Sequence, residues 1–339
     1  VMAHLRDDQL LRVRIDAGGD CTALMGAIED EGAHYVIKAR LTKEIAKSEK
    51  DLGSLEKKLA NAGFVEKAPP DVVEAVSHSL ARGSLNCIAH QPEIELSQLL
   101  VEAFPEAERA CFSNSGTEAV MQAVRLCRAY TKRSKVVKFE GHYHGFSDQG
   151  LVSSWFRCAG PRDAPSPVRA CQGQDAGVVE NTIVLQYGLP AALAQLEQLA
   201  DEVACVICEP MPSTMCTYNV EFLTALRALC TRLDVPLVFD EAVTGFRVQY
   251  GGIQHKIGVY PDLTCLAKIV GGGLPMGAVV GKARYIHMGK TSGDPFIDFE
   301  SKAFIGGTMS GNSLSCSAGI ATLRHLRAHP EIYDQLERH

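Results

Sequence analysis

From about residue 70 onward, short apolar runs alternate with amphipathic helical stretches. The strand candidates are 109–113, 135–139, 203–208, 236–239, 263–267 and 277–281, and the helix candidates include 117–132, 190–200, 220–233 and 312–328. Three of the apolar runs, beginning at 203, 236 and 263, start about 30 residues apart, which is the size of a strand–helix–strand unit. This alternation predicts an α/β fold in which helices cover both faces of a mostly parallel sheet.

The first 70 residues have a different pattern. Residues 1–42 contain two strand-like runs, LLRVRIDAGGD and HYVIKARLT, around a short helix-like stretch. Residues 43–62 are highly charged, and their apolar positions recur at helical spacing, which predicts a solvated helix or half of a coiled-coil hairpin. Gly63 ends this helix, and Ala68-Pro69-Pro70 follows as a break. An N-terminal α/β fragment and a charged helix therefore precede the main domain.

Composition narrows the choice of partners and compartment. The 339 residues are 46% hydrophobic and carry a net charge of -6, which argues against nucleic acid or an anionic membrane as the main partner. No stretch approaches the roughly 20 apolar residues that span a bilayer. The twelve cysteines lie scattered along the sequence, many in apolar runs, which is typical of reduced thiols in a cytoplasmic protein. Cys205 and Cys208 form a CxxC pair, but strand alternation would put them on opposite faces of a sheet, which disfavours a metal or redox site.

Three segments carry residues suited to chemistry. In the first, Ser113-Asn-Ser-Gly-Thr-Glu-Ala119, small residues open a helix after a strand. Backbone N–H groups there favour an anion such as phosphate, although an ordinary helix cap has the same pattern. The second segment places Asp240 at the end of an apolar strand, where ligands bind in open α/β sheets. A helix cap or a surface acid is the alternative for Asp240.

In the third segment, Lys268 lies within an apolar run that three glycines follow. A desolvated lysine with a lowered pKa attacks carbonyl groups, whereas a lysine that extends into solvent at a strand end is the ordinary alternative. Together the three segments match the needs of pyridoxal phosphate (PLP). Its phosphate must be anchored, its ring nitrogen needs an acid, and its aldehyde needs a lysine.

Six segments now identify a resemblance. SNSGTEAV, FEGHYHG, ICEPM, LVFDEAVTGFR, LAKIVGGGLPMGAVVG and GGTMSGNSL occur in the order found in class-III PLP-dependent aminotransferases of fold-type I. Residues from about 70 to 339 are most similar to glutamate-1-semialdehyde 2,1-aminomutase and neighbouring aminotransferases. The resemblance implies the large, PLP-binding domain over 77–339, truncated at its C-terminal end, with the small domain largely missing.

The resemblance also implies roles for single residues. Lys268 would hold the cofactor as a Schiff base and shuttle a proton, and Asp240 would pair with the ring nitrogen. Ser115, Gly116 and Thr117 would bind the phosphate. Tyr143 would stack on the ring, and Glu209 would help to organise the cofactor edge.

Thr308 would reach the phosphate of a neighbouring subunit, which implies a homodimer with shared active sites.

His142 and His144 are interpreted as loop or structural histidines. Two segments depart from the family pattern: Ala242 stands where valine is usual, and 212–216 lacks the common glycine.

The N-terminal segments resemble other families. Residues 43–76 are similar to the C-terminal coiled coil of valyl-tRNA synthetase, and 1–42 resemble more loosely a fragment of an insertion-sequence transposase, in which Asp16 would match a catalytic acid. The favoured alternative for Asp16 is an acid in a surface loop, because the fragment lacks the rest of the catalytic set. A mosaic gene, a misassembled sequence and a deliberate chimera would each produce this arrangement.

Three functional hypotheses follow. The leading one is amino-group transfer by an aminotransferase or an aminomutase, with a small amino acid or amine as donor and a keto or aldehyde acceptor. The second is a non-catalytic remnant that retains the cofactor-binding or dimerising core. The third, nucleic-acid binding by the lysine-rich helix at 43–62, is disfavoured because that helix carries nearly as many acids as bases.

Overall fold

The computed structural model describes residues 70–84 and 89–337. Residues 1–42 with Asp16, and the predicted charged helix and linker up to residue 69, therefore lie outside the described residues. All elements below belong to the part of the protein that follows them.

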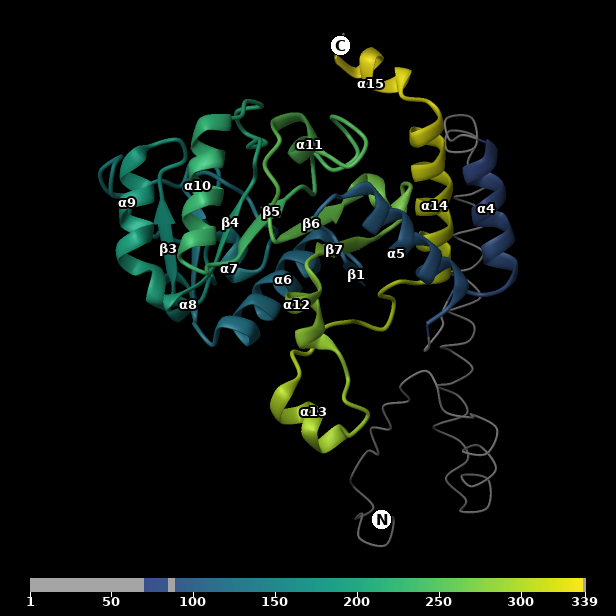
Figure 1. Cartoon of the computed structure of the whole chain (residues 1–339), viewed down its shortest axis with the longest axis horizontal. Coiled ribbons are helices and arrows are strands. Elements are labelled where there is room, and N and C mark those ends of the chain that lie inside the picture. The colour runs from purple at the N-terminus through teal and green to yellow at the C-terminus, as the bar shows by residue number, and fades with distance from the viewer. Residues whose placement is uncertain (1–69, 85–88, 338–339) are drawn as a thin grey trace, which may run out of the picture. The chain divides into compact units, whose positions relative to one another are not determined.

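A seven-stranded mixed sheet forms the centre of this part (Figure 1), in the order β1-β7-β6-β5-β4-β2-β3. The strands are β1 (Arg109–Ser113), β2 (Lys135–Phe139), β3 (Thr182–Leu185), β4 (Val203–Cys208), β5 (Leu237–Asp240), β6 (Leu263–Ala267) and β7 (Gly277–Gly281). Strands β3, β2, β4, β5 and β6 pair in parallel, and β7 runs antiparallel to both β6 and β1. The predicted mostly parallel sheet is confirmed.

The helices follow the expected alternation. They are α4 (Pro70–Ala81), α5 (Gln91–Ala103), α6 (Gly116–Thr131), α7 (Asp148–Leu151), α8 (Ala176–Glu180), α9 (Pro190–Leu199), α10 (Val220–Arg232), α11 (Ile253–Ile257), α12 (Ala283–Ile286), α13 (Pro295–Ser301), α14 (Ser313–Ala328) and α15 (Glu331–Glu337), with 3-10 turns η1 (Ala200–Glu202), η2 (Lys268–Gly271) and η3 (His287–Gly289). The four helices expected from periodicity, now α6, α9, α10 and α14, begin and end within one residue of their predicted bounds.

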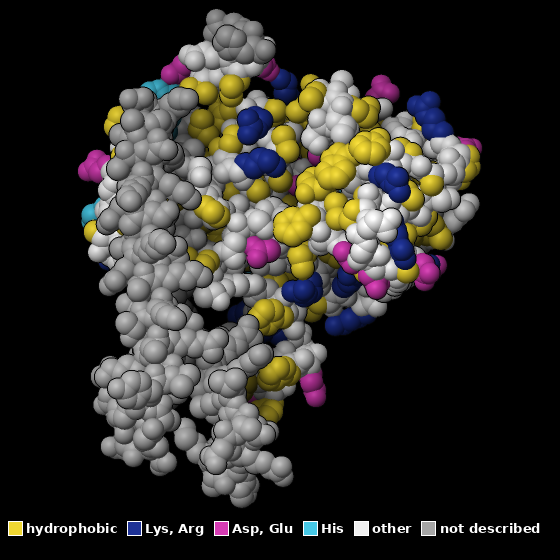
Figure 2. Space-filling model, turned by 180° about the vertical axis from the view of Figure 1, so that it is seen from behind, with side chains coloured by type: hydrophobic (Ala, Val, Ile, Leu, Met, Phe, Trp, Pro, Cys, Tyr) yellow, Lys and Arg dark blue, Asp and Glu magenta, His cyan; other side chains and the backbone are white. Residues whose placement is uncertain are grey.

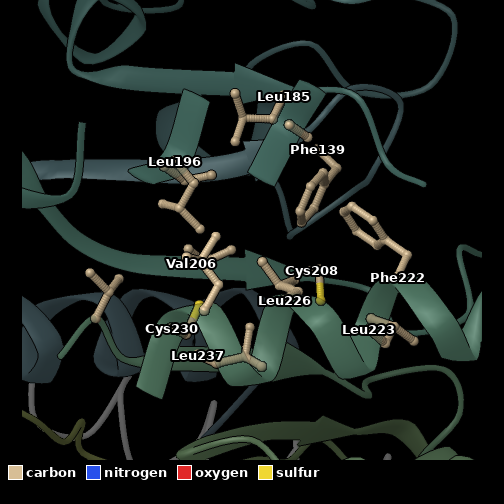
Figure 3. Close-up of a cluster of buried hydrophobic side chains, with 14 of the residues drawn as sticks. Phe139, Leu185, Leu196, Val206, Cys208, Phe222, Leu223, Leu226, Cys230 and Leu237 are labelled. Atoms are coloured by element: carbon tan, nitrogen blue, oxygen red, sulfur yellow. The ribbon is translucent and has the colours of Figure 1, made fainter. Parts of the chain in front are cut away.

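Alternation along β4 shows how the sheet is covered. Val206 and Cys208 pack with α9 and α10 on one face (Figure 3), while Cys205 and Ile207 pack with α6 on the other. Because side chains alternate along a strand, a continuous apolar run is what a sheet buried on both faces requires. The prediction that Cys205 and Cys208 face opposite ways is confirmed, and both are free, buried thiols.

A third apolar cluster lies at the β1–β7 side of the sheet. It joins α5 and α14 to these strands and to Val270 of η2. Helix α4 packs against α14 (Figure 1). Within the described residues, no helix is both long and apolar enough to cross a membrane.

Asp262, in the turn before β6, ties the amino-terminal end of the sheet together. Its buried carboxylate accepts hydrogen bonds from Arg227 of α10 at 2.7 Å, from the Leu237 amide at 2.9 Å and from Lys282 after β7 at 3.0 Å. One side chain therefore connects a helix and two strands at the end of the sheet opposite the carboxyl ends of the parallel strands.

Candidate active site at the carboxyl end of the sheet

The parallel strands end along one edge of the sheet, and the residues that follow them surround one cavity. This cavity has a volume of about 660 Å³. It is lined by Asn114, Ser115, Gly116, Thr117, Tyr143, Gly145, Glu209, Ser213, Asp240, Ala242, Val243, Arg247, Ala267, Lys268, Ile269, Gly273, Leu274, Pro275 and Met276. Seven of the eight predicted site residues therefore lie around one space, at the position where open α/β sheets bind ligands. Thr308 is the exception.

The first turn of α6 forms one wall. Ser115 is the N-cap, and its hydroxyl accepts a hydrogen bond from the Glu118 amide at 3.2 Å. The amides of Gly116 and Thr117 lie in the first turn, where the helix offers no acceptor. They therefore remain free to bind an anion. Gly277 of β7 lies under this turn, and a Cβ there would come within 2.2 Å of the Ser115 carbonyl oxygen. A glycine is therefore required for the turn to sit this close to the sheet.

Asp240, the last residue of β5, is buried at the base of the cavity. Its Oδ2 lies 2.8 Å from Nδ1 of His144, and its Oδ1 accepts the Ala242 amide at 3.1 Å. Both oxygens are thereby oriented, and the carboxylate is held at a fixed angle to the cavity. Ala242 itself lines the cavity, and its Cβ would lie 3.5 Å from a Cβ built on Gly116.

Lys268 is the first residue after β6, and it starts the turn η2. Its backbone has a φ of 54°, an uncommon conformation for a residue other than glycine. The side chain is exposed and lines the cavity, and no hydrogen bond or ion pair holds it among the described residues. Of the two alternatives for this segment, the structure shows the lysine that extends into solvent at a strand end, because β6 ends one residue before Lys268.

A different lysine is the buried one. Lys138 of β2 is 1% exposed, and burial lowers its pKa to about 7, against the opposing influence of the Glu209 and Asp240 carboxylates. The sequence run KVVKF does not distinguish Lys138 from a surface lysine, and the sequence did not identify it.

Tyr143 and Glu209 are joined through the backbone. The Glu209 carboxylate accepts the Tyr143 amide at 3.0 Å and the Ser213 amide at 3.2 Å. Burial and the nearby Asp240 charge both raise the pKa of the Tyr143 phenol. Glu209 thus connects the loop after β2 to the loop after β4 and holds Tyr143 at the cavity.

Glu241, the neighbour of Asp240, anchors the loop that follows β5. Its fully buried carboxylate accepts hydrogen bonds from Thr244 at 2.8 Å, from the Ile253 amide at 2.7 Å and from Gln254 at 2.8 Å. Burial raises the pKa of Glu241 despite these donors. The anchored loop carries Arg247, which extends this wall of the cavity.

The two histidines beside Tyr143 have more specific roles than the sequence suggested. His144 contacts Asp240, while Nδ1 of His142 accepts the Glu209 amide at 3.1 Å. Burial first, and then the charges of His144 and Lys138, lower the pKa of His142 well below its ordinary value, so His142 is neutral. The pairing of His144 with Asp240 was missed because the two residues are 96 positions apart.

Thr308 lies outside the cavity of its own subunit. It is exposed, as are its neighbours Gly307 and Met309. Its expected contact with the phosphate of another subunit therefore stays a prediction.

Comparison with known proteins agrees with this geometry. The family model for class-III aminotransferases matches residues 60–338. A glutamate-1-semialdehyde 2,1-aminomutase from Desulforudis audaxviator is 43% identical over 273 residues, which cover 80% of this chain and 60% of that protein. The corresponding enzyme from Rhodopirellula baltica is 42% identical over 279 residues, 80% of this chain and 59% of that protein. The chain thus spans about 60% of the length of these relatives.

Solved structures give the same result for the fold. An omega-transaminase from Sphaerobacter thermophilus superposes with a TM-score of 0.71 and 36% identity, covering 76% of this chain and 59% of that one. A transaminase with PLP bound superposes with a TM-score of 0.69 and 33% identity, covering 78% of this chain and 61% of that one. The described part therefore has the fold of the large domain of fold-type I transaminases.

Proposed function

Because the chain belongs to the class-III aminotransferase family, we propose that it binds pyridoxal phosphate and transfers amino groups. One observation carries the proposal. Lys268, Asp240 and the free amides at the start of α6 line the same cavity, although they lie at the ends of three different strands.

The residues present fit this cofactor. The unpaired amides of Gly116 and Thr117, with the positive end of the α6 dipole, suit a phosphate. The fixed carboxylate of Asp240 suits a protonated ring nitrogen, and the Lys268 amine, which has no partner within 70–84 and 89–337, suits an aldehyde. Tyr143 and Ala242 provide surfaces beside which a flat ring can lie.

Each side chain then has a defined task. When bound, pyridoxal phosphate supplies an electron-withdrawing ring that stabilises the charge left by a departing substrate proton. Asp240 would pair with the ring nitrogen and favour its protonated form, and His144 holds Asp240 in orientation. Lys268 Nζ takes the proton from the substrate carbon and returns it at the next step. Glu209 holds Tyr143 in position.

We also propose a homodimer in which Thr308 binds the phosphate of the neighbouring subunit. Thr308 is exposed and does not line its own cavity. Near it in the sequence, Phe304, Phe299 and Phe296 are 74%, 90% and 83% exposed, and hydrophobic side chains reach the surface on the face shown in Figure 2. Apolar surface of this kind is typical of a subunit contact. Thr308 and this apolar segment therefore support shared active sites.

The reaction has two forms that share this chemistry. In one, the amino group of a small amino acid or amine passes to a keto or aldehyde acceptor. In the other, it migrates within a single molecule, as the names of the aminomutase relatives indicate for those enzymes. We propose amino-group transfer in the cytoplasm. Transfer between two molecules and migration within one molecule are both outcomes of a screen of amino donors. The screen would follow conversion of the cofactor between its aldehyde and amine states.

The test is the absorption of lysine-bound cofactor. We expect pyridoxal phosphate to produce a visible band with the 339-residue protein, and Lys268→Ala to abolish it. Lys290→Ala is the matched control, since Lys290 is also exposed but does not line the cavity. A wild-type protein without the band, or a band that persists in Lys268→Ala, would overturn the proposal and leave a non-catalytic core as the remaining hypothesis.

A further inference from the structure

Trp155 stacks on Tyr143, the aromatic residue of the cavity wall. The ring centroids are 4.8 Å apart, and the ring planes differ by only 14°. Tyr143 lines the cavity and Trp155 does not, so Tyr143 is shared between the cavity and Trp155. The tryptophan is 45% exposed and is the only tryptophan in the sequence.

The backbone around Trp155 is held in an uncommon conformation. Ser153 and Trp155 have φ values of 48° and 56°, in the left-handed region that non-glycine residues seldom adopt. Two hydrogen bonds tie this segment to Gly141, which donates to the Ser153 carbonyl at 2.8 Å and accepts from the Trp155 amide at 3.0 Å. Strained backbone persists only where its surroundings hold it.

Buried Lys138 provides this restraint. Its ammonium group donates to the Gly150 carbonyl at 3.0 Å, to the Ser154 hydroxyl at 3.1 Å and to the Val152 carbonyl. Ser154 in turn donates to the His142 carbonyl at 3.0 Å. When Lys138 is protonated, all three of its ammonium protons thus have acceptors in the segment that leads to Trp155, and these hydrogen bonds offset part of the cost of desolvation.

We propose that Trp155 is a positioning residue for the cofactor site: its ring supports Tyr143 from the side away from the cavity, and Lys138 and Ser154 hold Trp155 there. The inference rests on the proposed function, because the ring that Tyr143 would contact is that of pyridoxal phosphate. Without Trp155, the Tyr143 side chain would be free to rotate away from the cavity.

Cofactor affinity of the 339-residue protein provides the first test, measured by titration of the cofactor-free form with pyridoxal phosphate. A stacked aromatic pair corresponds to roughly a two- to tenfold effect. We therefore expect Trp155→Ala to raise the dissociation constant several-fold and Trp155→Phe to restore most of the loss. Phe156→Ala is the matched control, because Phe156 is an adjacent, 86% exposed aromatic residue outside the cavity lining, and it should leave affinity unchanged.

The coupling between the effects of Lys138 and Trp155 on cofactor affinity provides the second test. Lys138→Met should weaken cofactor binding as Trp155→Ala does, and the double variant should lose little more, because both changes remove the same support. Ser154→Ala is the milder variant if Lys138→Met does not fold. Unchanged affinity in Trp155→Ala, or fully additive losses in the double variant, would refute the proposal.

Tryptophan emission separates this inference from the proposed function. In the cofactor-free protein, tryptophan emission comes from Trp155 alone, so Tyr143→Leu and Ser154→Ala should each increase the quenching of that emission by acrylamide. If the protein binds no cofactor but these changes appear, the proposed function fails and the support of Tyr143 by Trp155 stands. If the cofactor binds but neither variant changes the quenching of Trp155 emission, the positioning role of Trp155 fails while the proposed function stands.

Discussion

Individual side chains at the candidate site are held by partners that lie far away in the sequence. Asp240 depends on His144, Tyr143 on Glu209, and Trp155 on Lys138. Lys268 differs, since nothing among the described residues restrains its amine. In the proposed reaction, the Lys268 amine must move between partners, whereas Asp240 must hold a ring in one orientation. The contrast between the unrestrained Lys268 and the restrained Asp240 is what this proposal requires.

At this scale we predict the consequence of removing the partner of Asp240. Hydrogen bonds to a charged group contribute roughly 1.5–3 kcal/mol, so His144→Phe should slow conversion of the cofactor from its aldehyde to its amine form about tenfold to a hundredfold. His144→Asn should recover part of the rate, because its amide can donate to Asp240 from a similar position. Stopped-flow absorbance measures both rates. Exposed His78 gives the control, and an equal loss in His78→Ala would contradict the interpretation.

Single helices and strands are stabilised mainly by the apolar faces they bury, but Asp262 adds an ionic connection at the amino-terminal end of the sheet. Burial by itself would raise the pKa of Asp262. The charge of Arg227 and the hydrogen bonds from Leu237, Arg227 and Lys282 outweigh burial and lower that pKa below its ordinary value. A carboxyl group with a lowered pKa stabilises the folded state above its unfolded pKa, and this contribution is lost as the pH falls through the folded value.

Asp262→Asn should therefore lower the free energy of unfolding by roughly 2–3 kcal/mol at neutral pH. The difference from wild type should shrink as the pH falls below about 4, because the unfolded carboxyl binds its proton there before the folded carboxyl does. Urea unfolding at pH 7 and at several acidic values measures this difference. Asp201→Asn, at an exposed position in η1, should change stability little at any pH. A constant difference across the pH range would show that the charge of Asp262 is not what stabilises the fold.

For the whole molecule, the proposed sharing of Thr308 predicts complementation between two defective subunits. Lys268→Ala lacks the amine, and Thr308→Val lacks the hydroxyl offered to the neighbour. A mixed dimer would contain one intact site, composed of Lys268 from one subunit and Thr308 from the other.

Refolding the two variants together should restore about a quarter of the wild-type lysine-bound cofactor at limiting pyridoxal phosphate, since about half of the dimers are mixed and each has one complete site of two. The absorbance of the mixture, compared with that of the variants refolded separately, measures the gain. Each variant refolded alone is the control. A mixture that equals the average of its components would mean that Thr308 serves its own subunit or none.

Much of the sheet could be predicted because its strands are local features. Six apolar runs gave strands within a residue of their observed bounds, since burial on both faces demands continuous apolar sequence. Strand β3 (Thr182–Leu185) was missed because its apolar run is only three residues long, Ile183 to Leu185, and polar residues stand on both sides of it. The antiparallel direction of β7 was also beyond reach, because an apolar run carries no sign of its orientation.

The candidate residues were recognised from the order of short motifs, and seven of them line the cavity because a residue that follows a parallel strand must lie at the same edge of the sheet. Tertiary structure alone decided the rest. It brought His144 to Asp240 across 96 positions, turned Lys268 outward at the end of β6, and buried Lys138 beneath the segment that carries Trp155. Such contacts depend on which strands become neighbours, and the hydrophobic pattern of a strand does not specify its neighbours.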